Sequence, residues 1–239
     1  MKVEAFAPAK INLTLHVTGQ RADGYHLLDS LVVFTDFGDT ILAQPSTVFA
    51  LSVDGPYAGG IPTDDSNLVV AAAKLFGADC PTQLHLTKNL PAASGIGGGS
   101  SDAAATLRAM SELWNRTGPE DSAVLGLGAD VPVCHLARSV RMQGVGEKLV
   151  PVATPPLHMV LVNPGVSMPT PKVFSALTRK DNPPMPSEFP VWRDVAEFCE
   201  WLAQQRNDLQ AAATTLSPQI ADVTGEIAKT TGCLLSRMS

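Results

Sequence analysis

The chain has 239 residues, of which 45% are hydrophobic and 17% are charged, and its formal net charge is −6 at pH 7. This composition indicates a globular protein long enough for one large domain or two small ones. No basic run or basic–aromatic stripe is present, so we expect no nucleic-acid partner. No apolar run approaches the roughly 20 residues of a membrane span, and the first residues hold no long apolar core, so we expect neither a membrane partner nor a signal peptide.

Four cysteines are spread along the chain without a CxxC pair, and no cluster of histidines accompanies them. A zinc site usually shows closely spaced cysteine and histidine ligands. The pattern therefore favours four reduced thiols in a cytoplasmic protein. The cysteines are Cys80, Cys134, Cys199 and Cys233.

Apolar and polar residues alternate in much of the first third of the chain, which predicts strands. In KINLTLHVT (residues 10–18) every second residue is apolar, as in a half-buried strand. Helical spacing begins in DDSNLVVAAAKLFG (64–77) and stops at Gly77. Further strands are expected at residues 27–39, 49–55 and 82–89.

Helical spacing dominates the second half. A helix is predicted from about Ser101 to Asn115, and the chain's second part begins near Val150. Strands followed by helices indicate an α+β protein, arranged in two lobes. In chain order we expect a buried strand at residues 156–165, a short helix at 170–177, a proline-rich surface loop at 180–190, and helices at 192–205 and 218–232.

The stretch PAASGIGGGSSDAAATL (residues 91–107) is unusual because six of the seven residues from Gly95 to Ser101 are glycine or serine. The predicted helix follows at once, so its first backbone N–H groups are unpaired and the positive end of its dipole faces the glycines. Residues without side chains let a ligand approach the backbone closely. We therefore expect a phosphate site here rather than a flexible loop ended by a helix cap.

Two common nucleotide motifs do not fit this stretch. A P-loop requires a lysine after the glycines, and none is present. A dinucleotide fingerprint requires a parallel βαβ unit with a later acidic residue, and this setting is missing too.

The stretch resembles the second motif of the GHMP kinases, Pro-x3-Gly-Leu-Gly-(Gly/Ser)-Ser-Ser, with Ile96 in place of the usual leucine. Other segments match the same family: PAKINLTLHVTGQRADGYHLLDSL (8–31), LGADVPVC (127–134), NPGVSMPTPKVF (163–174) and NDLQ (207–210). The resemblance spans nearly the whole chain. It implies an α+β, two-lobed GHMP kinase fold, with an N-terminal lobe like ribosomal protein S5 and a ferredoxin-like α/β C-terminal lobe.

The resemblance also implies the domain boundaries. Residues 1–149 would form the N-terminal ATP-binding domain and residues 150–239 the C-terminal domain. The family's third motif begins as LLSRMS and stops at Ser239. We therefore expect the second domain to be truncated, without the glycines that help to close the phosphate site.

The family resemblance assigns the chemistry to two residues. Asp130, in Gly-Ala-Asp-Val-Pro, matches the carboxylate that accepts the proton of the acceptor hydroxyl. Lys10 matches the lysine that holds this carboxylate and offsets developing charge. ATP is expected on the glycine-rich loop, at Pro91, Ala92, Ala93, Ser94, Gly95, Ile96, Gly97, Gly98, Gly99, Ser100 and Ser101.

The remaining matches concern the acceptor, which the resemblance gives as a small molecule, a cytidine diphosphate-linked methylerythritol. Tyr25 would stack on the cytosine, His26 would bond its edge, and Phe174 would cover its other face. Thr170 would contact the substrate, and Asn12, two residues after Lys10 on the same strand face, would orient substrate or lysine.

Mg²⁺ should bridge the ATP phosphates, but its protein ligands stay unknown because the sequence offers no paired carboxylates. We expect phosphates, water and a hydroxyl such as that of Ser101 to hold the ion. The oligomeric state is expected to be a monomer or a weak homodimer.

We therefore expect a cytoplasmic bacterial kinase of isoprenoid precursor synthesis by the non-mevalonate route, acting on a tertiary hydroxyl. Two alternatives stay open. The chain could be another small-molecule kinase of the family, of the homoserine or mevalonate type, or a nucleotide-binding remnant without turnover.

Overall fold

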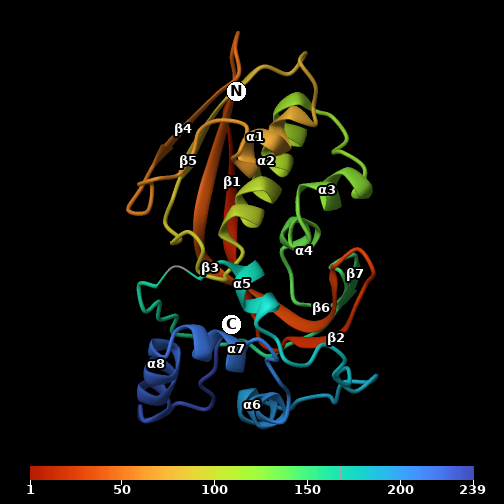
Figure 1. The fold of residues 1–239 in the computed structure, drawn as a ribbon. Helices are drawn as coiled ribbons and strands as arrows, with labels where there is room; N and C mark the ends of the chain where they lie inside the picture. The colour runs from red at the N-terminus through yellow and green to blue at the C-terminus, as the bar shows by residue number, and fades with distance from the viewer. Residues whose placement is uncertain (167) are drawn as a thin grey trace. The chain divides into compact units, whose positions relative to one another are not determined.

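A computed structural model describes residues 1–166 and 168–239 (Figure 1). The chain forms two compact units. Unit 1 holds Met1–Ile11 and Phe34–Arg138, and unit 2 holds Asn12–Val33 and Ser139–Ser239. Residues 12–33 and 139–149 thus pack with the second unit, whereas the boundary between the family's two domains at 149/150 stays a prediction.

Unit 1 is a sheet covered by helices. β4 (Ala50–Asp54) pairs in parallel with β5 (Thr82–Thr87), β5 pairs antiparallel with β3 (His26–Pro45), and β1 (Val3–Asn12) also pairs with β3. Figure 1 shows α1 and α2 side by side along these strands. The helices are α1 (Leu68–Lys74), α2 (Gly98–Trp114), α3 (Asp121–Leu127) and α4 (Val131–Leu136).

Helix α2 is the centre of the unit 1 core. Ala103, Ala104 and Ala105 are completely buried, so the helix backbone can lie close to the sheet. Leu107 and Met110 fill the space further along the same helix. The helix ends at Trp114, and the next residue, Asn115, caps it with a left-handed φ of 47°, which is common at helix ends.

Unit 2 holds the other part of β3. This part pairs with β2 (His16–Gln20) on one side and β6 (Val140–Gly144) on the other, and β6 pairs with β7 (Lys148–Pro151), all antiparallel. Its core includes Leu15, Val17, Val173 and Leu209. The helices are α5 (Thr170–Ser175), α6 (Val195–Ala203), α7 (Gln210–Leu216) and α8 (Gln219–Ala228).

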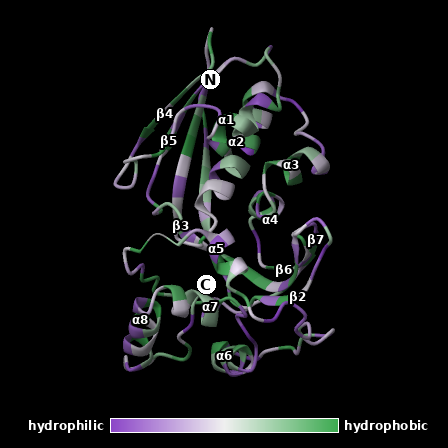
Figure 2. Cartoon of the chain, viewed as in Figure 1, coloured by the Kyte–Doolittle hydropathy of each residue, from purple (hydrophilic) through white to green (hydrophobic). Residues whose placement is uncertain are grey.

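Hydrophobic and hydrophilic residues mix on helix α8 in Figure 2, and none of its side chains is fully buried. Among the described residues, no helix is both long enough and apolar enough to cross a membrane.

The structure confirms the α+β class and most predicted elements. The strands expected at 27–39, 49–55 and 82–89 are β3, β4 and β5. The helices expected at 64–77, 170–177, 192–205 and 218–232 are α1, α5, α6 and α8, each somewhat shorter than predicted.

The continuous half-buried strand predicted at residues 10–18 is wrong. β1 ends at Asn12 and β2 begins at His16, and the polar residues between the apolar ones are buried as well. Hydrogen bonds within unit 2 make this burial possible. The Thr14 hydroxyl accepts the Leu31 N–H, and the Arg206 N–H donates to His16 Nε2.

The buried strand predicted at residues 156–165 is also wrong. This segment is irregular, and most of its apolar side chains are exposed, Val160 to 80%. A strand needs neighbours that satisfy its backbone groups, and the part of the chain that the structure describes places no strand beside it.

Candidate active site

The structure brings Lys10 and Asp130 together although 120 residues separate them. Lys10 Nζ lies 2.8 Å from Asp130 Oδ2. Lys10 lies near the end of β1 with its side chain 5% exposed, whereas the Asp130 side chain, at the start of α4, is 35% exposed. The ammonium is therefore fixed inside unit 1, while the carboxylate can be reached from solvent.

The glycine-rich loop runs directly against Lys10. The Lys10 N–H donates to the Ile96 carbonyl at 2.9 Å. Gly97 has a left-handed φ of 66°, and a Cβ built there would lie 3.0 Å from the Lys10 Cβ. Because a side chain at position 97 would meet both backbone strain and this contact, the close approach of loop and lysine requires glycine.

Helix α2 begins earlier than the sequence predicted. Gly98, Gly99 and Ser100 form its first turn, and Gly97 caps it without a side-chain hydrogen bond. The prediction of a start near Ser101 was wrong because glycine has a low helix propensity, so positions 98 and 99 carried no local signal for a helix. The N-terminal N–H groups and the positive dipole end are therefore presented by glycine and serine residues.

Two serine hydroxyls of the loop are bound to carbonyl oxygens of unit 1. Ser101 is completely buried and its hydroxyl donates to the Pro8 carbonyl at 2.5 Å, while the Ser94 hydroxyl donates to the Pro91 carbonyl at 2.7 Å. Both bonds shape the loop. Ser100, in the first turn of α2, is half-buried.

Cys134, on α4, lies buried near Lys10 and Asp130. Burial raises the pKa of the Cys134 thiol to about 12. The thiol therefore stays protonated at neutral pH and is not a nucleophile.

Sequence reasoning missed a buried cluster of ionisable side chains next to the ends of the loop, formed by Asp39, Lys88 and Asp102. Lys88 Nζ contacts the carboxylates of both aspartates. Residues Thr82, Leu84, Leu86 and Lys88 are all buried, so the alternation along β5 carried a signal that Lys88 points inward.

In unit 2 the predicted base-binding residues are partly together. The His26 ring stacks on the Phe174 ring, with centroids 4.6 Å apart and planes 23° apart. Tyr25 is 60% exposed, and Thr170 is the first residue of α5. At this separation no base fits between His26 and Phe174, so Phe174 covers the imidazole in this structure.

His26 nevertheless offers a polar atom without a partner. Its Nε2 is buried and makes no hydrogen bond within the described structure. Burial, with a smaller contribution from Lys180, lowers the pKa of His26 from its ordinary value, so the ring is neutral at pH 7. Asn12 is buried, and its side-chain oxygen accepts a hydrogen bond from the Ser30 hydroxyl at 3.2 Å.

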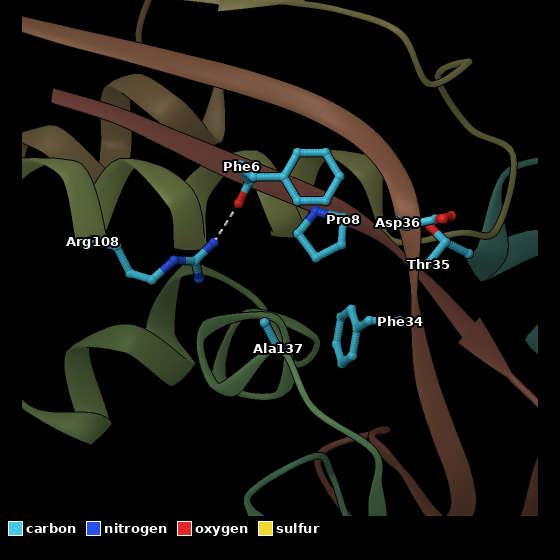
Figure 3. A pocket seen from close by; sticks show the side chains of 7 residues that line it. All are labelled: Phe6, Pro8, Phe34, Thr35, Asp36, Arg108 and Ala137. Carbon is cyan, nitrogen blue, oxygen red and sulfur yellow. Dashed lines mark hydrogen bonds between the residues drawn. The ribbon is translucent and has the colours of Figure 1, made fainter. Parts of the chain in front are cut away.

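An open hollow of about 510 Å³ lies elsewhere on unit 1 (Figure 3). Arg108 borders it and donates to the Phe6 carbonyl at 2.7 Å. Lys10 and Asp130 do not line it, so we do not assign it to the reaction. The lining residues are Phe6, Pro8, Phe34, Thr35, Asp36, Arg108 and Ala137.

The fold and the loop are those of a GHMP kinase. The family model of the GHMP kinases N terminal domain matches residues 67–137, which include the glycine-rich loop and Asp130. A crystal structure of homoserine kinase from Cytophaga hutchinsonii shares this fold, with a TM-score of 0.58 at 16% identity over 98% of this chain and 80% of that chain.

More similar proteins define the family more narrowly. A 4-diphosphocytidyl-2-C-methyl-D-erythritol kinase of Cereibacter sphaeroides is 57% identical over 99% of this chain and 85% of its own length. The enzyme of that name from Ruegeria pomeroyi is 55% identical over 100% of this chain and 86% of its own length. A crystal structure of 4-(cytidine 5'-diphospho)-2C-methyl-D-erythritol kinase matches with a TM-score of 0.74, at 34% identity over 95% of this chain and 82% of that chain. The chain belongs to the 4-diphosphocytidyl-2-C-methyl-D-erythritol kinase family.

Proposed function

We propose that this chain transfers the γ-phosphoryl group of ATP to the 2-hydroxyl of 4-diphosphocytidyl-2-C-methyl-D-erythritol, giving the 2-phosphate and ADP. The observation that carries the proposal is the 2.8 Å contact of Lys10 and Asp130 beside the glycine-rich loop. The identity of 57% to a kinase of this name supports the choice of acceptor.

Asp130 is the group that accepts the proton of the acceptor hydroxyl. As the proton moves to the carboxylate, the hydroxyl oxygen forms its bond to the γ-phosphorus and the bond to the ADP oxygen breaks. Lys10 holds the carboxylate in place and stabilises the negative charge on the transferred group. The ammonium can do both because its position is fixed by burial and by the loop contact at Ile96.

The loop from Pro91 to Ser101 is the proposed site of the ATP phosphates. Backbone N–H groups at the start of a 17-residue helix and the positive end of its dipole attract phosphate oxygens. The left-handed Gly97 brings this cradle next to Lys10. Phosphate and proton acceptor therefore meet in one unit of the chain.

Mg²⁺ is proposed as the metal that accompanies ATP, where it would neutralise phosphate charge. The described residues hold no group of three or more acidic, histidine or cysteine side chains able to bind a metal ion. A cation that takes most of its ligands from phosphates and water is compatible with this donor set.

Tyr25, His26 and Phe174 are proposed to bind the cytosine, and Asn12 and Thr170 to contact the rest of the acceptor. The unpaired, neutral His26 Nε2 supports this, because a cytosine edge would give the buried nitrogen its missing partner.

We further propose that the reaction belongs to the non-mevalonate route to isoprenoid precursors, in the cytoplasm, and that the chain acts as a monomer or weak homodimer. The methylerythritol acceptor named for the relatives supports this pathway. Size measurement of the purified chain at several concentrations would test the oligomeric state.

The direct test is ADP release from ATP and Mg²⁺ with the cytidyl acceptor, and with homoserine and mevalonate in parallel. An Asp130→Asn variant should lose about 10²- to 10⁴-fold in kcat and still bind ADP, because it removes the proton acceptor and keeps the side-chain shape. Asp65→Asn, at an exposed ion pair with Lys74, is the matched control.

Each outcome decides between the alternatives. Turnover confined to the cytidyl acceptor and lost in Asp130→Asn supports the proposal. Turnover with homoserine or mevalonate would assign a different acceptor. Nucleotide binding without turnover of any acceptor would indicate a remnant.

A further inference from the structure

Lys88 lies between two carboxylates in the interior of unit 1. Its Nζ is 2.9 Å from Asp102 Oδ2 and also contacts Asp39 Oδ2. Lys88, Asp39 and Asp102 are 3%, 0% and 3% exposed. None of the three takes part in the chemistry described above. Three ionisable side chains removed from water to this extent are costly to bury, so their effect is better sought in the geometry that they impose.

Asp39 fixes the chain immediately before the glycine-rich loop. Its Oδ1 accepts the Asn89 N–H at 2.5 Å and the Leu90 N–H at 2.8 Å, while its Oδ2 faces Lys88. Pro91, the first loop residue, follows Leu90 directly. The backbone that leads into the loop is therefore held by one buried carboxylate.

Asp102 fixes the chain immediately after the loop. It lies one turn into α2, directly behind Ser101, and its carboxylate bonds Lys88. The first turn of α2 also packs against the Lys88 ammonium, because a Cβ built at Gly98 would lie 3.0 Å from Lys88 Nζ. One side chain thus contacts elements at both ends of the loop.

We propose that Lys88 is a positioning residue which, through Asp39 and Asp102, clamps the two ends of the glycine-rich loop and so holds it in the shape that receives the ATP phosphates. The proposal rests on the proposed function, in which this loop binds ATP. A clamp that acts on the two ends of the loop adds no contact to the nucleotide. It reduces the number of loop conformations that binding must exclude.

Burial affects the protonation of Asp102, one of the two aspartates that contact Lys88. Burial raises the pKa of Asp102 to about 8; the neighbouring Asp39 adds to this rise and Lys88 opposes it. At pH 7 the carboxyl of Asp102 is therefore mostly protonated, which reduces the charge that is buried around Lys88. Lys88 and Asp39 are the charged groups that face this carboxyl.

The test compares three variants with the wild-type chain. Lys88→Met removes the cation, and Lys88→Met/Asp39→Asn removes the charge that the first variant leaves unpaired, so that the fold is maintained without the clamp. Lys74→Met is the matched control, because it also removes a lysine of unit 1. Lys74 is the last residue of α1 and forms an exposed ion pair with Asp65.

Two measurements are made on each variant. Hydrogen exchange of the backbone amides of residues 91–101 is followed in the ligand-free chain, and KM for ATP and kcat are measured with the cytidyl acceptor. We expect both Lys88 variants to exchange about tenfold faster across the loop and to show KM for ATP about tenfold higher, with kcat changed less. The control should match the wild type.

The proposal is overturned if the double variant, folded by circular dichroism, matches the control in both loop exchange and KM. It is also overturned if kcat falls while KM for ATP and loop exchange stay the same, because that pattern would indicate a role in the chemical step. Failure of the proposed function has a different signature. The wild-type chain would then show no turnover, while loop exchange and ADP binding would still report on the clamp.

Discussion

Replacement of Asp102 by asparagine is expected to abolish a pH dependence in the stability of unit 1. In the unfolded chain the carboxyl titrates near its ordinary pKa of 3.8, whereas burial raises its pKa in the folded chain to about 8. Between these values the folded state holds one proton that the unfolded state has released. The free energy of unfolding of the wild type therefore decreases as the pH rises through this window.

The size of the effect follows from the number of protons. One proton bound by the folded state alone changes the free energy of unfolding by about 1.4 kcal/mol per pH unit. From about pH 5 to about pH 7 the wild type should lose up to about 3 kcal/mol through this group. Asparagine keeps the shape and holds no such proton, so the variant should gain stability relative to the wild type over the same range.

The assay is urea unfolding of both proteins at several pH values, read by hydrogen exchange of α2 peptides so that unit 1 alone is reported. The difference between variant and wild type should grow steadily up to about pH 8 and then level off. A difference that is constant across this range would refute the inference that Asp102 is protonated in the folded chain. Asp65→Asn, fully outside the cluster, should show no such trend.

Two further substitutions test the packing of each unit. Gly97→Ala should lower nucleotide affinity at least about tenfold and destabilise unit 1 by about 1–2 kcal/mol, because alanine at φ 66° would be strained and would press on Lys10. Equilibrium binding of ADP and urea unfolding measure the two effects, and unchanged binding would contradict the close approach of the loop to Lys10. Asp29→Asn should destabilise unit 2 by about 3–5 kcal/mol, because the Asp29 carboxylate accepts two hydrogen bonds from the Arg141 guanidinium (2.8 and 2.7 Å) in a buried ion pair and also accepts the Met185 N–H. A loss below about 1 kcal/mol, measured by urea unfolding followed on β3 and β6 peptides, would contradict this expectation.

The elements that the sequence predicted well are those with a strong local signal. The alternation of residues 82–89 and the helical spacing of residues 64–77, with its stop at Gly77, reflect which face of the backbone meets the core. The period of such a pattern follows from the geometry of the helix or strand itself, so the folded protein keeps the predicted element. The glycine-rich stretch is also a local signal, and its resemblance to a family motif predicted the GHMP kinase fold.

Local sequence patterns gave wrong predictions where segments far apart in the chain determine the structure. Residues 10–18 alternate like a strand facing water on one side, yet Thr14 and His16 are buried because partners such as Leu31 and Arg206 come from far along the chain. The largely apolar segment 156–165 predicted a buried strand, but a strand forms only where a neighbouring strand can share its backbone hydrogen bonds.

For the proposed active site, the sequence by itself determined the residue types: a lysine, an aspartate and a glycine-rich stretch ahead of a helix. Tertiary structure decided that Lys10 and Asp130 meet at 2.8 Å and that the loop touches the lysine at Gly97. It also decided that Lys88 lies between two buried carboxylates. The physical reason is that the contact of two side chains depends on how the sheet and helices pack, and sequence spacing across 120 residues carries no information about that distance.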